Sequence, residues 1–489
     1  MPAASALATL DVAAILEAPG SGPASGPVRI RIADGRIAAI EPLAGDGDGS
    51  LAIAAPANAH DHGRGLRTLA FGAVDDALEA WIPTLYREPM LDPYRRAVVA
   101  FARMAEGGVA ATNHSHGPQD EDNLFIEAEG VSRAARDVGI HVAFAAPFAD
   151  RNPLVYGDQQ TFLAAAEPAL RPGLEASLRP PKNVRDFLRL VDEEMTALEH
   201  PWFSLQYCPI GVQWVSDASM AAIAEASAAN GRRIHIHLLE TRYQREWADH
   251  AYPGGLIKRL DEIGFLSPRL SVAHGVFLRE EESALLGERG VIVSVNTSSN
   301  FRLRSGIAPV AGFVRAGLRF GMGLDSQPLD DDDDMLREMR LVWLNHRGFG
   351  LEDAVSTARV FEAAAIDGRR AVIGEDGGGR IAVGAPADIL VLDYAGMAPD
   401  LLSSAADPTN VLLTRATRKH IRKLIVAGRV VVEDGRCVTV DKPALEAELI
   451  AEAKTAWAAA PPSDGETVAM KRAIHRYYGC SCHAGGVLR

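Results

Sequence analysis

Short apolar runs alternate with longer segments of helical spacing through the middle of the chain. Between residues 56 and 377 we find seven such runs, and the extended segment before His60 makes an eighth. Most stretches between them, such as 218–230 and 280–290, are long enough for a crossover helix. Eight strand–helix units favour a closed (β/α)8 TIM barrel over an open sheet, which usually has fewer strands. The seven runs cover residues 108–112, 142–146, 202–207, 233–238, 270–274, 290–295 and 318–323.

Both ends of the chain show shorter strands of alternating pattern. Residues 27–33 and 36–40 flank the turn pair Asp34-Gly35 as in a hairpin, and strand patterns return at 387–393 and 423–432. We therefore predict an α/β protein whose barrel carries a small β-sandwich domain built from both termini; two unrelated caps are the alternative. The predicted boundaries are 1–55 and 378–445 for the sandwich, 56–377 for the barrel, and 446–489 for a C-terminal helix and tail.

Two segments interrupt the barrel pattern. Residues 153–201 exceed what one crossover needs and include a predicted helix over 183–199. This excursion is either a lid over the barrel mouth or a surface insertion. The acidic run Asp330–Asp334 directly precedes a helical segment. Because carboxylates stabilise helix N-termini, we interpret the run as a helix start rather than a cation site.

Composition and charge narrow the class of protein. The 489 residues are 47% hydrophobic and 23% charged, as in a globular enzyme, and the formal net charge of −14 argues against nucleic-acid binding. No apolar run is long enough for a membrane span, and residues 1–20 lack the basic region of a signal peptide. The four cysteines do not form the spread of pairs that a disulfide scaffold needs. We therefore expect a cytoplasmic protein.

Metal-ligating residue types occur where the predicted strands end. In TIM barrels the chemistry lies at these carboxyl ends. Neutral imidazoles with one carboxylate suit Zn²⁺ or Fe²⁺ and leave a position open for water. The residues at these positions are His60 and His62, His114 and His116, His235 and His237 with Glu240 just after, His274, and Asp325.

Several spaced motifs in one order make the chain resemble the metal-dependent amidohydrolase superfamily, in its branch of cytosine-deaminase-like and triazine-hydrolase-like aminohydrolases. The resemblance covers almost the whole chain. Its motifs are Asn58-Ala-His60-Asp-His62, His237-Leu-Leu-Glu240-Thr241, Val272-Ala-His274-Gly, Ser299-Asn300-Phe-Arg-Leu-Arg-Ser305-Gly306, Gly323-Leu-Asp325-Ser and Gly384-Ala-Pro-Ala-Asp388.

The resemblance implies a role for each matched position. His60, His62, His237 and Asp325 would hold one divalent metal ion, which lowers the pKa of a bound water toward neutrality. Asp325 would also take the proton of that water. Glu240 would protonate a ring nitrogen and later the departing ammonia.

His274 would hydrogen-bond the attacking hydroxide or the developing oxyanion. Two-metal members of the superfamily carry a bridging lysine or carboxylate at the end of strand four. Residues 204–212 contain neither, and a buried, inert thiol is the expected state of Cys208. We therefore expect one metal ion, with zinc and iron both compatible.

The remaining candidates each have a structural alternative. His235 shares a face with His237 but lies one layer deeper, so we expect a hydrogen-bonded core histidine rather than a fifth ligand. For His114 and His116, substrate contact and a structural role are both open, and His116 is our candidate contact. Asp61 points away from its neighbouring ligands and is expected to be structural.

Further substrate contacts are predicted around the barrel mouth. Arg64 could bind a carbonyl or carboxylate, and Gln213 and Trp214 lie at the pocket wall, although tryptophans more often pack than stack on a substrate. Cys480, Cys482 and His483 resemble half of a zinc site, but no second pair lies nearby in the sequence, so we expect no metal there.

The favoured function is hydrolytic deamination of an aminated nitrogen heterocycle of pyrimidine, purine, pterin or triazine type. Hydrolysis of a cyclic amide, formimino group, ester or aryl halide by the same site is the alternative. An inactive relative acting as an interaction protein ranks below both, because every expected ligand is present. The expected partner is a small-molecule substrate, and a homodimer is the default assembly.

Overall fold

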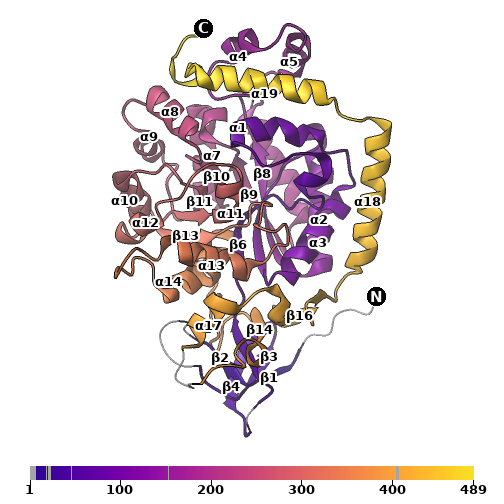
Figure 1. Ribbon diagram of the computed structural model, residues 1–489, viewed down its shortest axis with the longest axis vertical. Helices are drawn as coiled ribbons and strands as arrows, with labels where there is room; N and C mark the ends of the chain where they lie inside the picture. Colours follow the sequence, from indigo (N-terminus) through magenta and orange to yellow (C-terminus); the bar gives the residue numbers. More distant parts are fainter. Residues whose placement is uncertain are drawn as a thin grey trace.

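The computed structural model describes residues 7–17, 19, 24–45, 47–151, 154–402 and 407–488. Its centre is a closed barrel of eight strands with helices around it, which confirms the predicted TIM barrel (Figure 1). The strands pair in parallel around the barrel. They are β6 (Ala57–Asp61), β7 (Ala111–Ser115), β8 (His141–Phe148), β9 (Phe203–Pro209), β10 (Ile234–Leu238), β11 (Leu270–His274), β12 (Ile292–Val295) and β13 (Arg319–Met322).

The helices around the barrel begin where the sequence supplies caps. In α2 (Pro93–Glu106) the Asp92 carboxylate accepts a hydrogen bond from the Arg95 N–H, and Ser216 caps α7 (Asp217–Asn230) in the same way. The other helices up to the barrel's end are α1 (Leu78–Trp81), α3 (Leu124–Val138), α4 (Gln159–Ala165), α5 (Arg171–Ser177), α6 (Val184–Arg189), α8 (Arg242–Ala251), α9 (Leu256–Glu262), α10 (Glu280–Glu288), α11 (Thr297–Arg302), α12 (Val310–Arg315), α13 (Met335–His346), α14 (Thr357–Glu362) and α15 (Gly368–Val372).

The apolar run before the metal motif does not belong to the barrel. Residues Ser50–Ala54 form β5, which pairs with β14 (Ile389–Asp393) and β2 (Ala14–Ile15) in a six-stranded sheet. The first barrel strand is β6, which contains His60 itself. The sequence pattern missed β6 because its buried side chains include Asn58, His60 and Asp61, which are polar.

Strands from both ends of the chain meet in that six-stranded sheet. Its order is β17–β16–β15–β14–β5–β2, and β1 (Thr9–Val12), β3 (Val28–Ala33) and β4 (Arg36–Pro42) form a second sheet. The predicted strand over 423–432 divides at Ala427-Gly428, where both residues have positive φ. The resulting strands are β15 (Ile421–Val426), β16 (Arg429–Glu433) and β17 (Arg436–Cys437), and α16 (Tyr394–Met397) and α17 (Pro408–Arg415) lie between β14 and β15.

Helix α15 closes the amino-terminal end of the barrel. Val372 packs there against Ala57, Ala111 and Ala143, one small residue from each of β6, β7 and β8. Their short side chains leave room for the helix. The mouth of the barrel is therefore at the carboxyl ends of the strands.

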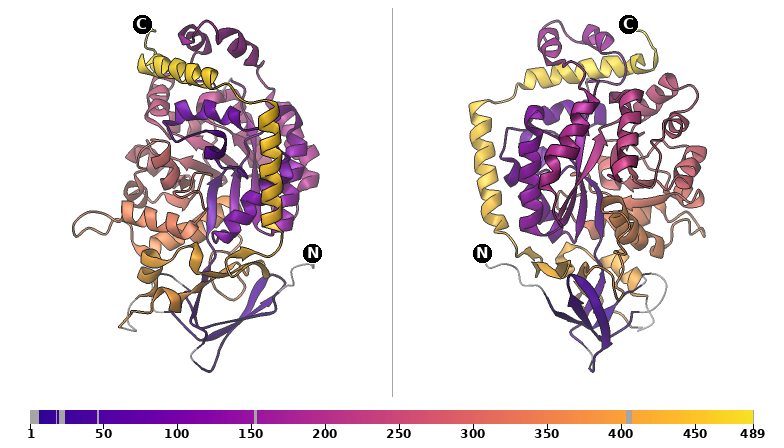
Figure 2. Two further views of the ribbon diagram at one scale, coloured as in Figure 1. Left: turned by 45° about the vertical axis from the view of Figure 1, so that its right-hand side comes forward. Right: turned by 180° about the vertical axis from the view of Figure 1, so that it is seen from behind.

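The C-terminal segment runs along the barrel and over its mouth. Helix α18 (Lys442–Ala459) lies against α2, and α19 (Asp464–Gly479) crosses near α1 and α4 (Figures 1 and 2). The disulfide that the described residues form joins Cys480 to Cys482, just after α19. Residues Val184–Leu198 are helical, as predicted for the excursion. None of the described helices is long and apolar enough to span a membrane.

Candidate metal centre

Six side chains at or just after four strand ends converge at the carboxyl end of the barrel. The ring centroids of His60 and His62 lie 5.0 Å apart, and that of His237 lies 4.8 Å from His60 and 5.4 Å from His62. The possible ligand atoms of His60, His62 and His237 all lie within 4.8 Å of one another, as do those of His60, His274 and Asp325. One metal ion fits between them. Glu240 completes the group beside His274.

Hydrogen bonds fix which nitrogen of two of these histidines can bind a metal. His62 Nδ1 lies 2.8 Å from the Ser115 carbonyl oxygen, and His237 Nδ1 lies 2.8 Å from that of Ile210. Because a carbonyl only accepts, each Nδ1 carries the proton, and each Nε2 presents a lone pair. The donor set therefore fits a divalent ion.

His60 has a different partner from the other two. Its Nδ1 lies 2.7 Å from His235 Nε2, and His235 Nδ1 lies 2.8 Å from Ser271 Oγ. The buried Nε2 of His60 lies 2.9 Å from Asp325 Oδ1 but makes no hydrogen bond within the described chain. Such a buried, unsatisfied nitrogen is expected of a metal ligand. His235 is fully buried and hydrogen-bonded, as the sequence predicts.

The chain of hydrogen bonds below His60 continues through the barrel core. Asn113 Nδ2 donates to Ser271 Oγ and to Gln206 Oε1, both at 3.4 Å. Gln206 Nε2 in turn donates to the Val372 carbonyl at 2.9 Å, in the helix that closes the barrel. Each of these side chains is buried. A polar string thus joins the candidate metal centre to the opposite end of the barrel.

Asp325 is held in a strained backbone conformation. Its φ is 55° and that of Ser326 is 51°, both in the left-handed region. The Asp325 N–H donates to the His60 carbonyl at 3.0 Å, and Ser299 Oγ donates to Asp325 Oδ2 at 2.6 Å. Burial raises the pKa of Asp325, but His60, His62 and His274 outweigh it and leave the pKa well below the usual value. The carboxylate is therefore ionised.

The pKa of Glu240 is shifted in the opposite direction from that of Asp325. Burial, reinforced by the charges of Asp325 and Glu79, raises its pKa well above the usual value. Its Oε1 accepts a hydrogen bond from Ser305 Oγ at 3.0 Å, and its Oε2 lies 3.5 Å from His274 Nε2. The pKa values of two carboxyl groups of one site are thus shifted in opposite directions, which is how enzymes separate acid from base.

His274 is a neutral imidazole at neutral pH. Burial lowers its pKa to about 4, with help from His60 and His62 and against the charge of Asp325. Its Nδ1 lies 3.0 Å from Asn300 Oδ1, an acceptor, so the proton is on Nδ1. His274 also has a positive φ of 74°. Its ring faces that of His237, with the centroids 5.6 Å apart.

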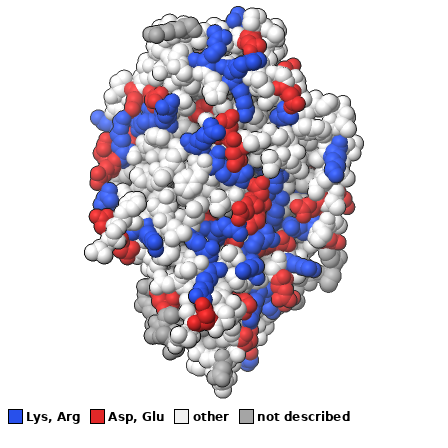
Figure 3. Space-filling view, in the orientation of Figure 1, with Lys and Arg blue, Asp and Glu red and all other residues white. Residues whose placement is uncertain are grey.

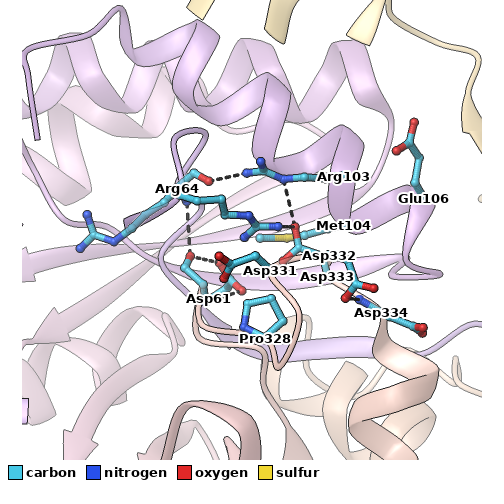
Figure 4. Close-up of polar contacts among 12 residues, drawn as sticks. Asp61, Arg64, Arg103, Met104, Glu106, Pro328, Asp331, Asp332, Asp333 and Asp334 are labelled. Atoms are coloured by element: carbon cyan, nitrogen blue, oxygen red, sulfur yellow. Dashed lines mark hydrogen bonds and ion pairs between the residues drawn. The ribbon is translucent and has the colours of Figure 1, made fainter. Parts of the chain in front are cut away.

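Asp61 links the ends of β6 and β13. Its carboxylate accepts hydrogen bonds from the N–H and Oγ of Ser326 and from the Gly63 N–H. Figure 4 shows the loop after the metal motif facing the acidic run, with Arg103 between them. Arg103 donates to the Arg64 carbonyl at 2.7 Å and lies 3.2 Å from Asp333. The chain around His60 and His62 is therefore anchored on both sides.

The predicted substrate contacts have partners within the chain. The Arg64 guanidinium pairs with Glu88 at 3.0 Å. His116 Nε2 lies 2.6 Å from Glu127 Oε2, and its Nδ1 lies 3.0 Å from His114. Both side chains thus already have charged or polar partners within the chain.

The other two candidates belong to the wall of the mouth. Trp214 donates to the Val155 carbonyl at 3.3 Å and packs on Tyr156. Gln213 is buried, and its Nε2 has no hydrogen-bond partner within the described chain. Gln213 is thus a candidate whose buried amide donor the described chain leaves unpaired.

One functional group escaped the sequence prediction. Glu79, at 6% exposure, accepts hydrogen bonds from Tyr156 Oη at 3.0 Å and from Thr241 Oγ1 at 2.5 Å. Burial raises its pKa. Gln244 joins the same cluster through Tyr156. The sequence signal was a lone carboxylate within the apolar helical segment 78–82, which is weak without knowledge of its neighbours.

Comparison with known proteins settles the family. The profile of the Amidohydrolase family matches residues 52–431. The chain is a member of the amidohydrolase family. It is thus a hydrolase acting on carbon–nitrogen bonds other than peptide bonds.

Among curated proteins, this amidohydrolase is similar to deaminases. It is 26% identical over 419 residues to the 5'-deoxyadenosine deaminase of Methanosarcina acetivorans, covering 84% of this chain and 87% of that protein. It is 32% identical over 237 residues to the Methanosarcina barkeri 5'-deoxyadenosine deaminase, covering 48% of this chain and 54% of that one. That match thus spans only about half the length of the relative.

Solved structures share the fold. An adenosine deaminase from Xanthomonas campestris with bound zinc superposes with a TM-score of 0.73 at 21% identity, over 92% of this chain and 98% of that one. A zinc complex of the atrazine chlorohydrolase TrzN from Arthrobacter aurescens gives a TM-score of 0.72 at 20% identity, over 91% and 99%. At these identities the likeness establishes the architecture alone.

Proposed function

We propose that this amidohydrolase is a metal-dependent hydrolytic deaminase of an aminated nitrogen heterocycle. The observation that carries the proposal is Glu240, a buried carboxyl group with a raised pKa, beside an ionised Asp325. Replacing an amino group on a ring requires an acid that protonates a ring nitrogen. The names of the similar curated proteins favour an adenine nucleoside among the possible heterocycles.

His60, His62, His237 and Asp325 would hold one divalent ion, either Zn²⁺ or Fe²⁺. When bound, such an ion lowers the pKa of water so that hydroxide is available at neutral pH. Zinc occurs in the structural neighbours named above. Both metals accept imidazole and carboxylate, so elemental analysis of the purified protein must decide between them.

The chain's own groups divide the proton transfers. Asp325 is ionised and accepts the proton of the attacking water. Glu240 donates its proton to the ring nitrogen next to the reacting carbon. His274 has its proton on Nδ1, directed at Asn300, so its Nε2 accepts a hydrogen bond from the attacking hydroxyl group. Each role follows from the protonation state that burial and neighbours impose.

An ammonia-release assay tests the proposal. The purified protein, loaded in turn with Zn²⁺ and Fe²⁺, is incubated with adenosine, 5'-deoxyadenosine, cytosine, guanine, a pterin and an aminotriazine. We expect ammonia from at least one of them, with an adenine nucleoside as the best substrate. No ammonia from any member of the panel, together with turnover of a cyclic amide, would exclude deamination.

Hydrolysis of another bond is the second candidate. The fold is shared with an atrazine chlorohydrolase, so displacement of chloride from an aromatic ring is compatible with the same arrangement. Chloride release from a chlorotriazine, measured beside the ammonia panel, distinguishes the two. Size-exclusion chromatography with light scattering tests the predicted homodimer, and cell fractionation tests the predicted cytoplasmic location.

A further inference from the structure

The end of the barrel opposite the candidate metal centre contains a cavity of about 420 Å³. It lies between the start of β9, the turn before β10, the end of α15 and the helical residues 192–199. Its lining includes Gln206, Arg232, Arg233 and Ile373. None of these residues takes part in the chemistry proposed above.

On one wall of this cavity a single guanidinium faces two carboxylates. Arg232 lies 2.8 Å from Asp192 and 2.9 Å from Glu199. Asp192 also accepts a hydrogen bond from Tyr207 Oη at 2.7 Å. This wall therefore carries one negative charge in excess and would not itself attract an anion.

Arg233, on the other wall, has no carboxylate within ion-pair distance among the described residues to balance its charge. Its Nε donates to the Ala371 carbonyl at 3.3 Å, but its guanidinium forms no ion pair with the described residues. Its buried Nη2 has no hydrogen-bond partner among them. A guanidinium remains charged in proteins, and leaving a buried donor unpaired costs free energy. The position calls for an acceptor that the described chain does not supply.

Two further arginines lie at amino-terminal strand ends on the same rim of the barrel. Arg269 precedes β11 and Arg319 begins β13, so both lie at the amino-terminal strand ends, like Arg233 before β10. Arg269 Nε donates to Ser227 Oγ at 3.0 Å and Arg319 Nη2 to the Gly290 carbonyl at 3.3 Å. Within the described chain neither has a carboxylate within ion-pair distance.

The arginines act on one another electrostatically. Burial lowers the pKa of Arg233 to about 10, and Arg269, Arg370 and Arg319 add to this effect against the charge of Glu375. Glu375 is exposed and pairs with Arg370. Positive charge thus exceeds negative charge at this rim. On the face seen in Figure 3, by contrast, acidic and basic side chains are interspersed.

We propose that this rim is a binding site for a small, multiply charged anion of the phosphate class, with Arg233 as its central ligand. Two parallel N–H donors of a guanidinium match two oxygens of a phosphate. Arg269 and Arg319 would supply additional charge. A cationic or apolar ligand would leave Arg233 unsatisfied. The site is separate from the candidate metal centre, since it lies at the other end of the strands.

Isothermal titration of the full-length protein with inorganic phosphate at constant ionic strength tests the proposal. We expect saturable binding with one site per chain. Arg233→Gln should weaken the binding at least tenfold. Arg436→Gln makes the same charge change at an exposed position in the small sheet and should leave the affinity unchanged.

A second variant keeps the test decisive if Arg233→Gln fails to fold, which circular dichroism would show. Glu375→Gln removes the exposed carboxylate at the rim and should tighten phosphate binding several-fold. Absence of saturable phosphate binding by the wild type, or unchanged affinity in either folded variant, would overturn the proposal. So would binding that survives Arg233→Gln but disappears with a chelator, because the phosphate would then be at the metal centre.

Discussion

At the scale of single residues, the candidate centre depends on where each imidazole carries its proton. The tautomers of His62 and His237 are fixed by backbone carbonyls, which can only accept a hydrogen bond. The tautomer of His60 depends instead on another side chain, that of His235, and on Ser271, to which His235 is hydrogen-bonded. A carbonyl cannot be removed by substitution, but His235 can. The His60 position is therefore where the orientation of a ligand can be tested.

We predict that His235→Phe weakens metal binding by about 10- to 100-fold, as loss of a ligand's hydrogen-bond partner does in other sites. The phenyl ring preserves most of the volume but cannot hold His60 Nδ1. The measurement is competition for Zn²⁺ against a chromogenic chelator. His475→Phe, on an exposed face of α19, is the control. Metal affinity equal to the wild type would show that His235 only fills space.

Glu240 is predicted to matter for turnover and not for metal content. Glu240→Gln keeps the shape and can still bond to Ser305, but it has no proton to donate at neutral pH. We expect kcat for ammonia release to fall by about 10²- to 10⁴-fold. Elemental analysis should show unchanged metal. Glu448→Gln, on the exposed side of α18, should have wild-type kcat, and so would Glu240→Gln if Glu240 were not the acid.

At the scale of elements, the sequence predicted most barrel strands because apolar runs of five or six residues mark them. It failed where buried strands carry polar side chains. Strand β7 begins at Ala111, three residues after the predicted start, and continues through the buried Asn113, His114 and Ser115. Hydrophobicity cannot locate such a strand, because its core residues are polar and hydrogen-bond to buried side chains outside the strand.

The start of α13 at the acidic run is an element that the sequence predicted correctly. Asp334 caps α13 by accepting from the Arg337 N–H, and it also accepts from the Arg418 N–H at 2.9 Å. We predict that Asp334→Ala lowers the free energy of unfolding by about 1–2 kcal/mol, the usual effect of losing a cap. Asp334→Asn retains a capping oxygen and should lose much less. Urea unfolding of both variants checks this, and equal losses would point to charge instead of capping.

At the scale of the whole molecule, ligand-type residues at the predicted strand ends, together with the family resemblance, predicted where the candidate centre lies. The carboxyl ends of all eight strands surround one mouth in a closed barrel, so His60, His237, His274 and Asp325 were expected to converge. What could not be predicted is contact between segments without a shared pattern. Tyr477 of α19 donates to the Tyr156 carbonyl at 2.8 Å, across 321 residues of sequence. Such contacts depend on helix packing that no local motif encodes.

Stability against pH is also a property of the whole chain, and His346 provides a test of it. This histidine of α13 is 7% exposed, and burial lowers its pKa from 6.5 to about 4. Between these values the unfolded chain binds the proton more tightly than the folded chain does, so stability falls as the pH falls.

The predicted size of this effect follows from the two pKa values. From pH 7 to pH 4.5, His346 should remove about 2 kcal/mol from the free energy of unfolding. Urea unfolding at both pH values should therefore show a drop about 2 kcal/mol smaller for His346→Gln than for the wild type. Glu338, whose pKa burial raises to about 7, opposes this trend but is present in both proteins, so its effect cancels in the difference. Equal drops would mean that His346 is protonated as readily in the folded chain as in the unfolded one.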